Sequence, residues 1–183
     1  MDMQRQHALE ECEAGDLSGY HAVCARVVES LRSSDRWFQA FHHDEVRTSE
    51  EAAQTRPGYT LHQGAKAIIV TLKRKAADAD KPAHVMLVFP ADEKFNSKQV
   101  KKALNVKDVR FAQPDVVSEI TGGVQPGGVP PFGNLFGIPV YVAPELMQLD
   151  RIVFNAGDRR FSLAVNVSDF KELVNPSTLP MLT

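Results

Sequence analysis

The sequence has few of the features that mark secreted or membrane proteins. Its only two cysteines, Cys12 and Cys24, form no CxxC pair and no Cys/His spacing of a zinc site. The pattern predicts two reduced thiols, with a disulfide between them as the alternative. The longest apolar runs, such as residues 85–89, are strand-sized and far below the ~18 residues of a membrane helix. Because the N-terminus also has no apolar stretch typical of a signal peptide, we expect a cytoplasmic protein with no membrane partner.

A strong excess of one charge is also absent. The formal net charge of −2 gives no global sign of nucleic-acid binding. The hydrophobic fraction of 43% excludes a disordered chain. The basic residues are nevertheless concentrated, because the segment from Lys66 to Arg110 holds eleven Lys and Arg against five Asp and Glu. Such a basic segment could bind a polyanion or could form a solvated, lysine-rich surface.

Helical patterns recur along the chain. Apolar residues at i, i+3 and i+4 spacing predict a helix between about Gly19 and Ser33. A second helix is expected to begin after Thr48, because a threonine cap followed three residues later by Glu51 is a capping box. Three more helices are expected to begin near residues 96, 114 and 168.

Strand patterns lie between these helices in irregular order. The apolar runs 65–72 and 85–89 flank a polar turn and predict a hairpin. Further strands are expected near residues 37–41, 109–111, 139–142, 151–154 and 162–165. Several strands follow one another without a crossover helix, which favours an α+β fold with a mixed sheet. We expect a single domain, flanked by short tails; the expected ranges are 1–18 for the N-terminal tail, 19–174 for the domain and 175–183 for a C-terminal tail or linker.

Glycine and proline are concentrated in one loop between Thr121 and Gly133. Five of the eleven glycines lie there, together with Pro126, Pro130 and Pro131. Glycine permits positive φ and a close approach of backbone to a ligand, whereas proline fixes φ and removes an N–H donor. The loop is therefore expected to be rigid and irregular, either as a ligand site or as a structural turn. Its spacing matches neither GxGxxG nor a Walker loop.

Lys66 is unusual because it directly precedes a strongly apolar run. A lysine at the entry of such a strand either extends its ammonium to solvent or is held there for an anion.

The histidines are less informative than Lys66 about a possible site. His42 and His43 are neighbours on a strand, so at most one can enter a given site, and both could be structural. His62 and His84 have no carboxylate at metal-ligand spacing, so neither a metal nor another cofactor is predicted.

Taken together, these segments resemble the YbaK/prolyl-tRNA-synthetase-associated family of editing domains. Residues 64–70 (GAKAIIV) look like its lysine-bearing strand, and residues 127–133 (GGVPPFG) look like its GxxxP loop. Residues 41–53 resemble its N-terminal strand and helix, and residues 153–157 its late strand and turn. The resemblance extends over about residues 20–174 and implies a mixed, partly barrel-like sheet with flanking helices.

The resemblance implies hydrolysis of the ester that joins a wrong amino acid to the 3′ end of tRNA. Alanine on proline tRNA is the leading implied substrate, because a pocket built for proline rejects a smaller residue by only about 1–3 kcal/mol. The implied partners are the acceptor end of tRNA and prolyl-tRNA synthetase or a synthetase complex. The alternatives are a non-catalytic tRNA-binding or synthetase-docking module of the same fold, and a hydrolase of small esters.

The resemblance also implies roles for individual residues. Lys66 would anchor the phosphate or ribose side of the substrate. Backbone groups of Gly127, Gly128 and Val129 would orient the aminoacyl carbonyl and ammonium, and Pro131 would fix the shape of the loop. Further substrate contacts are expected from His43, Thr48, Gly122, Pro130 and Phe132.

These roles require one spatial arrangement. The ammonium of Lys66 and the backbone from Gly127 to Pro131 must line a common cleft.

Two departures from the family pattern leave the rate and fine specificity open. Many relatives have Ser or Thr where this loop has Pro130, and many have Asp where Ala143 follows the strand near residues 140–142.

Overall fold

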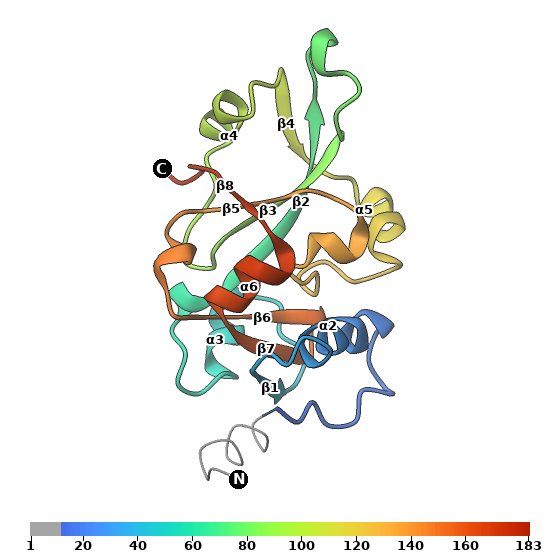
Figure 1. Ribbon diagram of the computed structural model, residues 1–183, viewed down its shortest axis with the longest axis vertical. Coiled ribbons are helices and arrows are strands. Elements are labelled where there is room, and N and C mark those ends of the chain that lie inside the picture. The colour runs from blue at the N-terminus through green and yellow to red at the C-terminus, as the bar shows by residue number, and fades with distance from the viewer. Residues whose placement is uncertain (1–11) are drawn as a thin grey trace.

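The computed structural model describes residues 12–183 and divides the strands between two sheets (Figure 1). Five α-helices, α2 to α6, lie around the sheets in this described part. The N-terminal tail expected over residues 1–18 falls outside the described residues as far as residue 11. No helix within residues 12–183 is long and apolar enough to cross a membrane.

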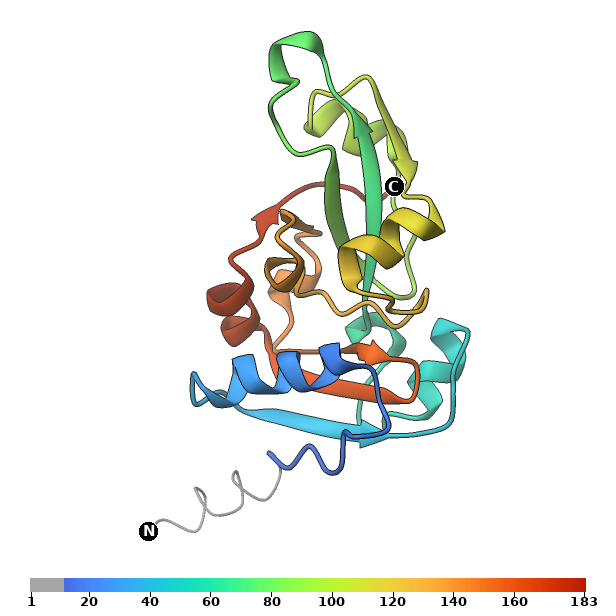
Figure 2. The ribbon, with the colours of Figure 1, turned by 90° about the vertical axis from the view of Figure 1, so that its right-hand side faces the viewer.

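The smaller sheet has three antiparallel strands in the order β1-β7-β6. They are β1 (Phe38–His42), β6 (Arg151–Asp158) and β7 (Phe161–Asn166). Helix α2 (Ala22–Arg32) lies along this sheet and covers it (Figure 2). Its apolar stripe, which includes Val23, Val27 and Leu31, is buried against the sheet, as the helical periodicity predicts.

The larger sheet has five strands in the order β4-β2-β3-β5-β8. They are β2 (Ala65–Lys73), β3 (His84–Pro90), β4 (Asp108–Phe111), β5 (Val140–Val142) and β8 (Ser177–Thr178). Strands β2 and β3 form the expected antiparallel hairpin, and β5 joins β3 in parallel, so the sheet is mixed. Strand β4 pairs with β2 only from Val70 to Lys73. The first half of β2 therefore has an open edge, with no paired strand within the described residues.

The remaining helices begin at residues whose side chains or geometry suit a helix start. They are α3 (Ser49–Gln54), α4 (Ser97–Ala103), α5 (Pro114–Thr121) and α6 (Val167–Val174). The capping box of α3 is confirmed, because Glu51 N donates to Thr48 Oγ1 and Thr48 N donates to the Glu51 carboxylate. Short 3-10 helices are η1 (Leu61–Gln63), η2 (Ala76–Asp78), η3 (Gly133–Phe136) and η4 (Leu146–Gln148).

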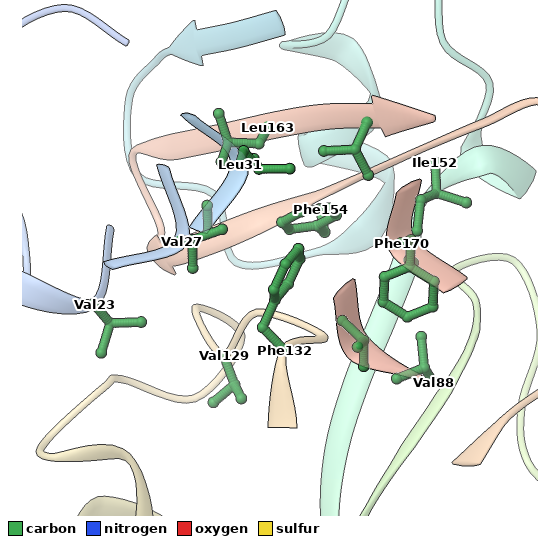
Figure 3. Close-up of a cluster of buried hydrophobic side chains, with 14 of the residues drawn as sticks. Val23, Val27, Leu31, Val88, Val129, Phe132, Ile152, Phe154, Leu163 and Phe170 are labelled. Carbon is green, nitrogen blue, oxygen red and sulfur yellow. The ribbon is translucent and has the colours of Figure 1, made fainter. Parts of the chain in front are cut away.

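The two sheets meet where β2 begins. Gly64 forms a parallel bridge with Val153 of β6 and so connects the larger sheet to the smaller one. Near this junction Phe132, Phe154 and Phe170 pack against one another in the core, with Phe132 between the other two (Figure 3). The expected α+β class with a mixed sheet and flanking helices is confirmed, and the sheet is divided in two rather than continuous.

Residues 175–183 differ from the expected tail or linker, because they pack against the larger sheet. Strand β8 pairs with β5, and Leu179 N donates to the carbonyl of Val142. The side chains of Leu179 and Met181 are buried. The segment 175–183 resembles a linker in sequence because Pro176 and Pro180 interrupt it. Its packing could not be expected, since distant strands build the apolar groove that receives its side chains.

Both cysteines are free thiols in the structure. Cys24 lies on the buried face of α2, where burial raises the pKa of its thiol to about 12. Since the thiolate is the reactive form of cysteine, Cys24 has the environment of a structural core residue.

Candidate functional site

A cavity of about 740 Å³ opens at the junction of the two sheets, beside the open edge of β2. Its walls come from the start of α3, the start of β2, the turn after β3, the start of α5, the glycine- and proline-rich loop, and β6. Its volume is typical of a small-molecule site. Lys66 and Gly127 both line this cavity, so the common cleft that their proposed roles require is present. The roles themselves stay predictions.

Four of the predicted site residues line the cavity from three different directions. Thr48 contributes from the start of α3, Lys66 from the start of β2, and Gly127 and Val129 from the loop. The capping box holds the Thr48 end of α3 in place, and strand pairing with β3 holds the backbone of Lys66 opposite Phe89. The Lys66 side chain is exposed.

The second half of the loop lies behind the cavity wall. Pro130, Pro131 and Phe132 are buried, and the fully buried ring of Phe132 packs between Phe154 and Phe170 (Figure 3). The substrate contact expected for Phe132 is therefore corrected, since its ring supports the wall from the core side. Gly128 is also buried and is not part of the cavity wall. A sequence cannot reveal which side of an irregular loop faces the core, because its residues have no periodicity.

Gly122 lies at the end of α5, away from the cavity wall. It has φ +73°, and its carbonyl oxygen accepts a hydrogen bond from His21 Nε2 (2.9 Å). A glycine with positive φ is a common way for a helix to end, because other residues are strained there. The expected substrate contact of Gly122 is therefore replaced by a role in ending the helix.

A buried polar network lies beneath the cavity. Arg56, which is only 6% exposed, donates from Nε to Ser162 Oγ (3.1 Å) and from Nη2 to Asn155 Oδ1 (2.8 Å). Asn155 in turn donates from Nδ2 to the carbonyl of Gly127 (2.8 Å). Arg56 and Asn155 also line the cavity. The network thus connects the cavity floor to the loop and limits movement of the loop.

Arg56 is a buried cation with no carboxylate partner among the described residues. Burial lowers the pKa of its guanidinium to about 10, which still leaves the group charged at neutral pH. A buried charge without a counterion is costly in free energy, and such groups concentrate at functional sites. Sequence reasoning missed Arg56, because an arginine before Pro57 at a helix end is an ordinary feature.

Within residues 12–183, some backbone groups of the loop are hydrogen-bonded and others have no partner. Three successive carbonyls already accept hydrogen bonds, from Arg159 Nε to Pro126 (2.6 Å), Asn155 Nδ2 to Gly127 (2.8 Å) and Gly157 N to Gly128 (2.8 Å). The amides of Gly127 and Val129 have no hydrogen-bond partner among residues 12–183. Gly127 has φ +85°, a conformation that favours glycine. Such amides suit an oxygen that carries or gains negative charge.

The open edge of β2 adds backbone groups to the same wall. The carbonyl of Ile69 accepts a hydrogen bond from Ala112 N, on the side of β2 away from β3. Hydrogen-bonding directions alternate along an antiparallel strand, so Ala67 turns its N–H and C=O to this same side. Ala67 lines the cavity, and no strand of the described structure pairs with it there.

Charged side chains of both signs surround the cavity. The cations are Arg47, Arg56, Lys66 and Lys94, and the anions are Glu50, Asp92 and Glu93. Asp92 is within 3.0 Å of His62 Nδ1 and forms an ion pair when that histidine is protonated. Arg56 is the buried member of the set, and it lies against β6 and the loop. Within residues 12–183, no group of three or more His, Cys, Asp or Glu side chains is arranged to hold a metal ion.

His43 lies behind the cavity and contacts the network instead of lining the wall. Its Nε2 is 2.8 Å from Ser162 Oγ, and its Nδ1 donates to the carbonyl of Asp44 (2.8 Å). Burial, aided by the positive charge of Arg56, lowers the pKa of His43. His43 was expected to contact substrate directly, but the structure places it behind the cavity wall, where it contacts Ser162 of the buried network.

The depressed pKa of His43 predicts a loss of stability at mildly acidic pH. The unfolded chain binds the proton near pH 6.5 more readily than the folded protein does, so the free energy of unfolding falls as the pH drops below about 6.5. Urea unfolding at pH 7.5 and pH 5.5 measures this difference. In His43→Gln the difference should be smaller than in the wild type. An unchanged difference in the variant would show that His43 does not cause the effect.

Comparisons with known proteins place the cavity within a recognised domain. Residues 43–173 match the family model of the aminoacyl-tRNA editing domain. A structure described as a candidate trans-editing enzyme for prolyl-tRNA synthetase has a TM-score of 0.74 and 18% identity, covering 90% of this chain and 99% of that one. A hypothetical protein has a TM-score of 0.73 and 21% identity, covering 86% and 99%. A chain from an epitope-grafting study on scaffold proteins has a TM-score of 0.73 and 17% identity, covering 89% and 98%. No curated protein sequence matches this chain.

Proposed function

This chain belongs to the aminoacyl-tRNA editing domain family, and we propose that it hydrolyses the ester between an amino acid and the 3′ end of a mischarged tRNA. The observation that carries the proposal is the set of groups that line the cavity at the sheet junction. It combines an exposed ammonium, Lys66, with two donor amides of the loop and a buried guanidinium, Arg56. An aminoacyl ester bears an electrophilic carbonyl next to ribose and phosphate groups, so it needs these kinds of partners.

The chemistry requires stabilisation of charge more than a strong nucleophile. Water adds to the ester carbonyl, and negative charge develops on the carbonyl oxygen. The ester C–O bond then breaks, and the departing ribose oxygen takes the proton that the attacking water has lost. In this proposal the amides of Gly127 and Val129, which line the cavity without a partner among residues 12–183, would donate to the carbonyl oxygen, and the charge of Arg56 would stabilise its negative charge through the low-dielectric wall. A ribose hydroxyl next to the ester can assist the attack, and positioning by the cavity supplies further rate enhancement.

Lys66 would bind the phosphate of the terminal nucleotide. Its side chain is exposed at the entry of β2, while its backbone is fixed by pairing with β3. An ammonium in this position acts as a point charge that an incoming phosphate can reach without displacing a protein partner. The acyl group would then extend from Lys66 toward the loop and Arg56.

Alanine is the proposed acyl group, and proline tRNA the proposed carrier. The fold shared with the candidate trans-editing enzyme for prolyl-tRNA synthetase supports this choice. Discrimination against proline would then depend on how the acyl group fits beside the loop, since the cavity as a whole, at about 740 Å³, is large enough for either residue. Prolyl-tRNA synthetase or a synthetase complex is the corresponding proposed partner.

A panel of charged tRNAs tests this function. Alanyl-tRNA(Pro) should be deacylated fastest among the alanyl, seryl, cysteinyl and threonyl esters, and correctly charged prolyl-tRNA(Pro) should react at least about tenfold more slowly. Release of the labelled amino acid measures each rate. Binding of all these tRNAs without turnover would indicate a non-catalytic module. Turnover of simple esters that tRNA does not inhibit would indicate a small-ester hydrolase.

A further inference from the structure

A second cavity, of about 610 Å³, adjoins the first. The two cavities share five lining residues, which are Lys66, Ile68, Glu93, Lys94 and Phe111. Lys66 therefore lies at the boundary, with the loop and Arg56 in the first cavity and an aromatic cluster in the second. A ligand that reaches Lys66 from the first cavity can continue into the second.

The second cavity contains an exposed aromatic ring that is held in place. Phe111 is 62% exposed and is the only large hydrophobic side chain of such exposure within residues 12–183. Its ring meets the edge of Phe95 (5.5 Å between centroids), and Phe95 packs in the same manner on Phe89 (5.8 Å). Phe111 is thus held by Phe95 but leaves most of its own apolar surface in solvent. Exposed apolar surface of this kind marks ligand or partner sites.

Positive charge accompanies these rings. Lys66, Lys94 and Arg110 line the second cavity, and Glu93 is the acidic side chain among its lining residues. Arg110 also pairs with Asp108 (2.7 Å), so its charge is partly compensated. The cavity belongs to the segment from Lys66 to Arg110 that carries eleven basic and five acidic residues. Aromatic rings beside lysine and arginine provide stacking surfaces and phosphate partners, which is how proteins bind single-stranded RNA.

We propose that this second cavity binds the unpaired nucleotides that precede the terminal nucleotide of the tRNA acceptor end. One base stacks on Phe111, and the backbone phosphates lie near Lys94 and Arg110. The inference rests on the proposed function, because an aminoacyl ester in the first cavity determines where the strand passes Lys66. Charge complementarity and the continuity of the two cavities favour RNA over an apolar peptide as the occupant.

Two substrates distinguish nucleotide binding in the second cavity from ester hydrolysis in the first. Aminoacyl-tRNA contains the unpaired nucleotides, whereas the same amino acid esterified to adenosine alone lacks them. Phe111→Ala should lower kcat/KM for aminoacyl-tRNA by about tenfold, the usual effect of losing one stacked base. Its kcat/KM for aminoacyl-adenosine should fall much less, because that substrate has no preceding nucleotide to stack on Phe111. Equal losses on both substrates, or no loss on either, would overturn the proposal.

Matched variants at the same position identify the interaction. Phe111→Trp keeps a stacking face and should retain activity on aminoacyl-tRNA, whereas Phe111→Leu keeps apolar bulk without that face and should behave as Phe111→Ala. Circular dichroism should show unchanged folding in all three, because the side chain is largely exposed. Equal activity of the Leu and Trp variants would reject stacking.

A binding measurement gives a result that does not depend on catalysis. Fluorescence anisotropy compares an uncharged RNA hairpin that ends in four unpaired nucleotides, ACCA, with the same hairpin cut to a blunt end. The wild type should prefer the overhang, and Phe111→Ala should lose that preference. No preference in the wild type overturns the second site even if deacylation is observed. A preference that depends on Phe111 in a protein without deacylase activity supports the site and rejects the proposed reaction.

Discussion

Lys66→Ala is expected to lower kcat/KM for deacylation of mischarged tRNA by about 10- to 100-fold. This is the range expected for loss of a hydrogen-bonded contact between charged groups. The ammonium is exposed at the mouth of the cavity, and its side chain has no hydrogen bond or ion pair within residues 12–183. Substrate therefore loses a partner that the folded protein does not itself use.

Stability should remain unchanged in the same variant, within about 0.5 kcal/mol, because surface substitutions away from packed or paired groups have small effects. Lys73→Ala is the matched control. Lys73 is exposed at the opposite end of the same strand and lies in neither cavity wall. Rates of amino-acid release and urea unfolding curves are measured for both variants. A fully active Lys66→Ala protein would remove Lys66 from the site.

Arg56→Met is expected to lower kcat by about 100-fold, the effect of losing one donor that stabilises an oxyanion. Methionine fills much of the same volume without a charge. Its effect on the free energy of unfolding should be small, since the cost of burying an unpaired guanidinium disappears together with the hydrogen bonds to Ser162 and Asn155. A large fall in kcat without a fall in stability would separate a functional charge from a structural one.

Two further variants sharpen this result. Arg47→Met removes an exposed arginine from the rim of the same cavity and should change kcat much less. Arg56→Lys keeps the charge but cannot bridge Ser162 and Asn155 with a planar fork, so it should recover only part of the lost activity. Wild-type kcat in Arg56→Met would show that the buried charge takes no part in the reaction.

Local signals in the sequence were sufficient to predict most elements. The capping box at Thr48 and the hairpin of apolar runs each depend on a few neighbouring residues, and both are present in the structure. Lys66 and Gly127 stand out because both depart from the pattern around them, and the family resemblance then led to the expectation that they share one cleft. A lysine before an apolar strand and a loop that alternates glycine with proline are visible without knowledge of the fold.

Features that depend on distant contacts could not be predicted in this way. Arg56 is held by hydrogen bonds to Ser162 and Asn155. Both residues are far from Arg56 in the sequence and come close to it only after β6 and β7 pair. The same holds for Phe132, whose ring could have faced either side of the loop. Met181 is another such residue, because the groove that buries it is formed by the larger sheet.

Part of the larger sheet can assemble earlier than the smaller sheet during synthesis of the chain. The hairpin and β4 use residues within 65–111, so they can pair while later residues are still being made. The smaller sheet joins Phe38 to Val165 and must wait for nearly the whole polypeptide. Long-range pairing of this kind slows folding. Since Asn155 holds the loop only after β6 is in position, a nascent chain forms the strands beside the second cavity first and completes the loop wall of the first cavity last.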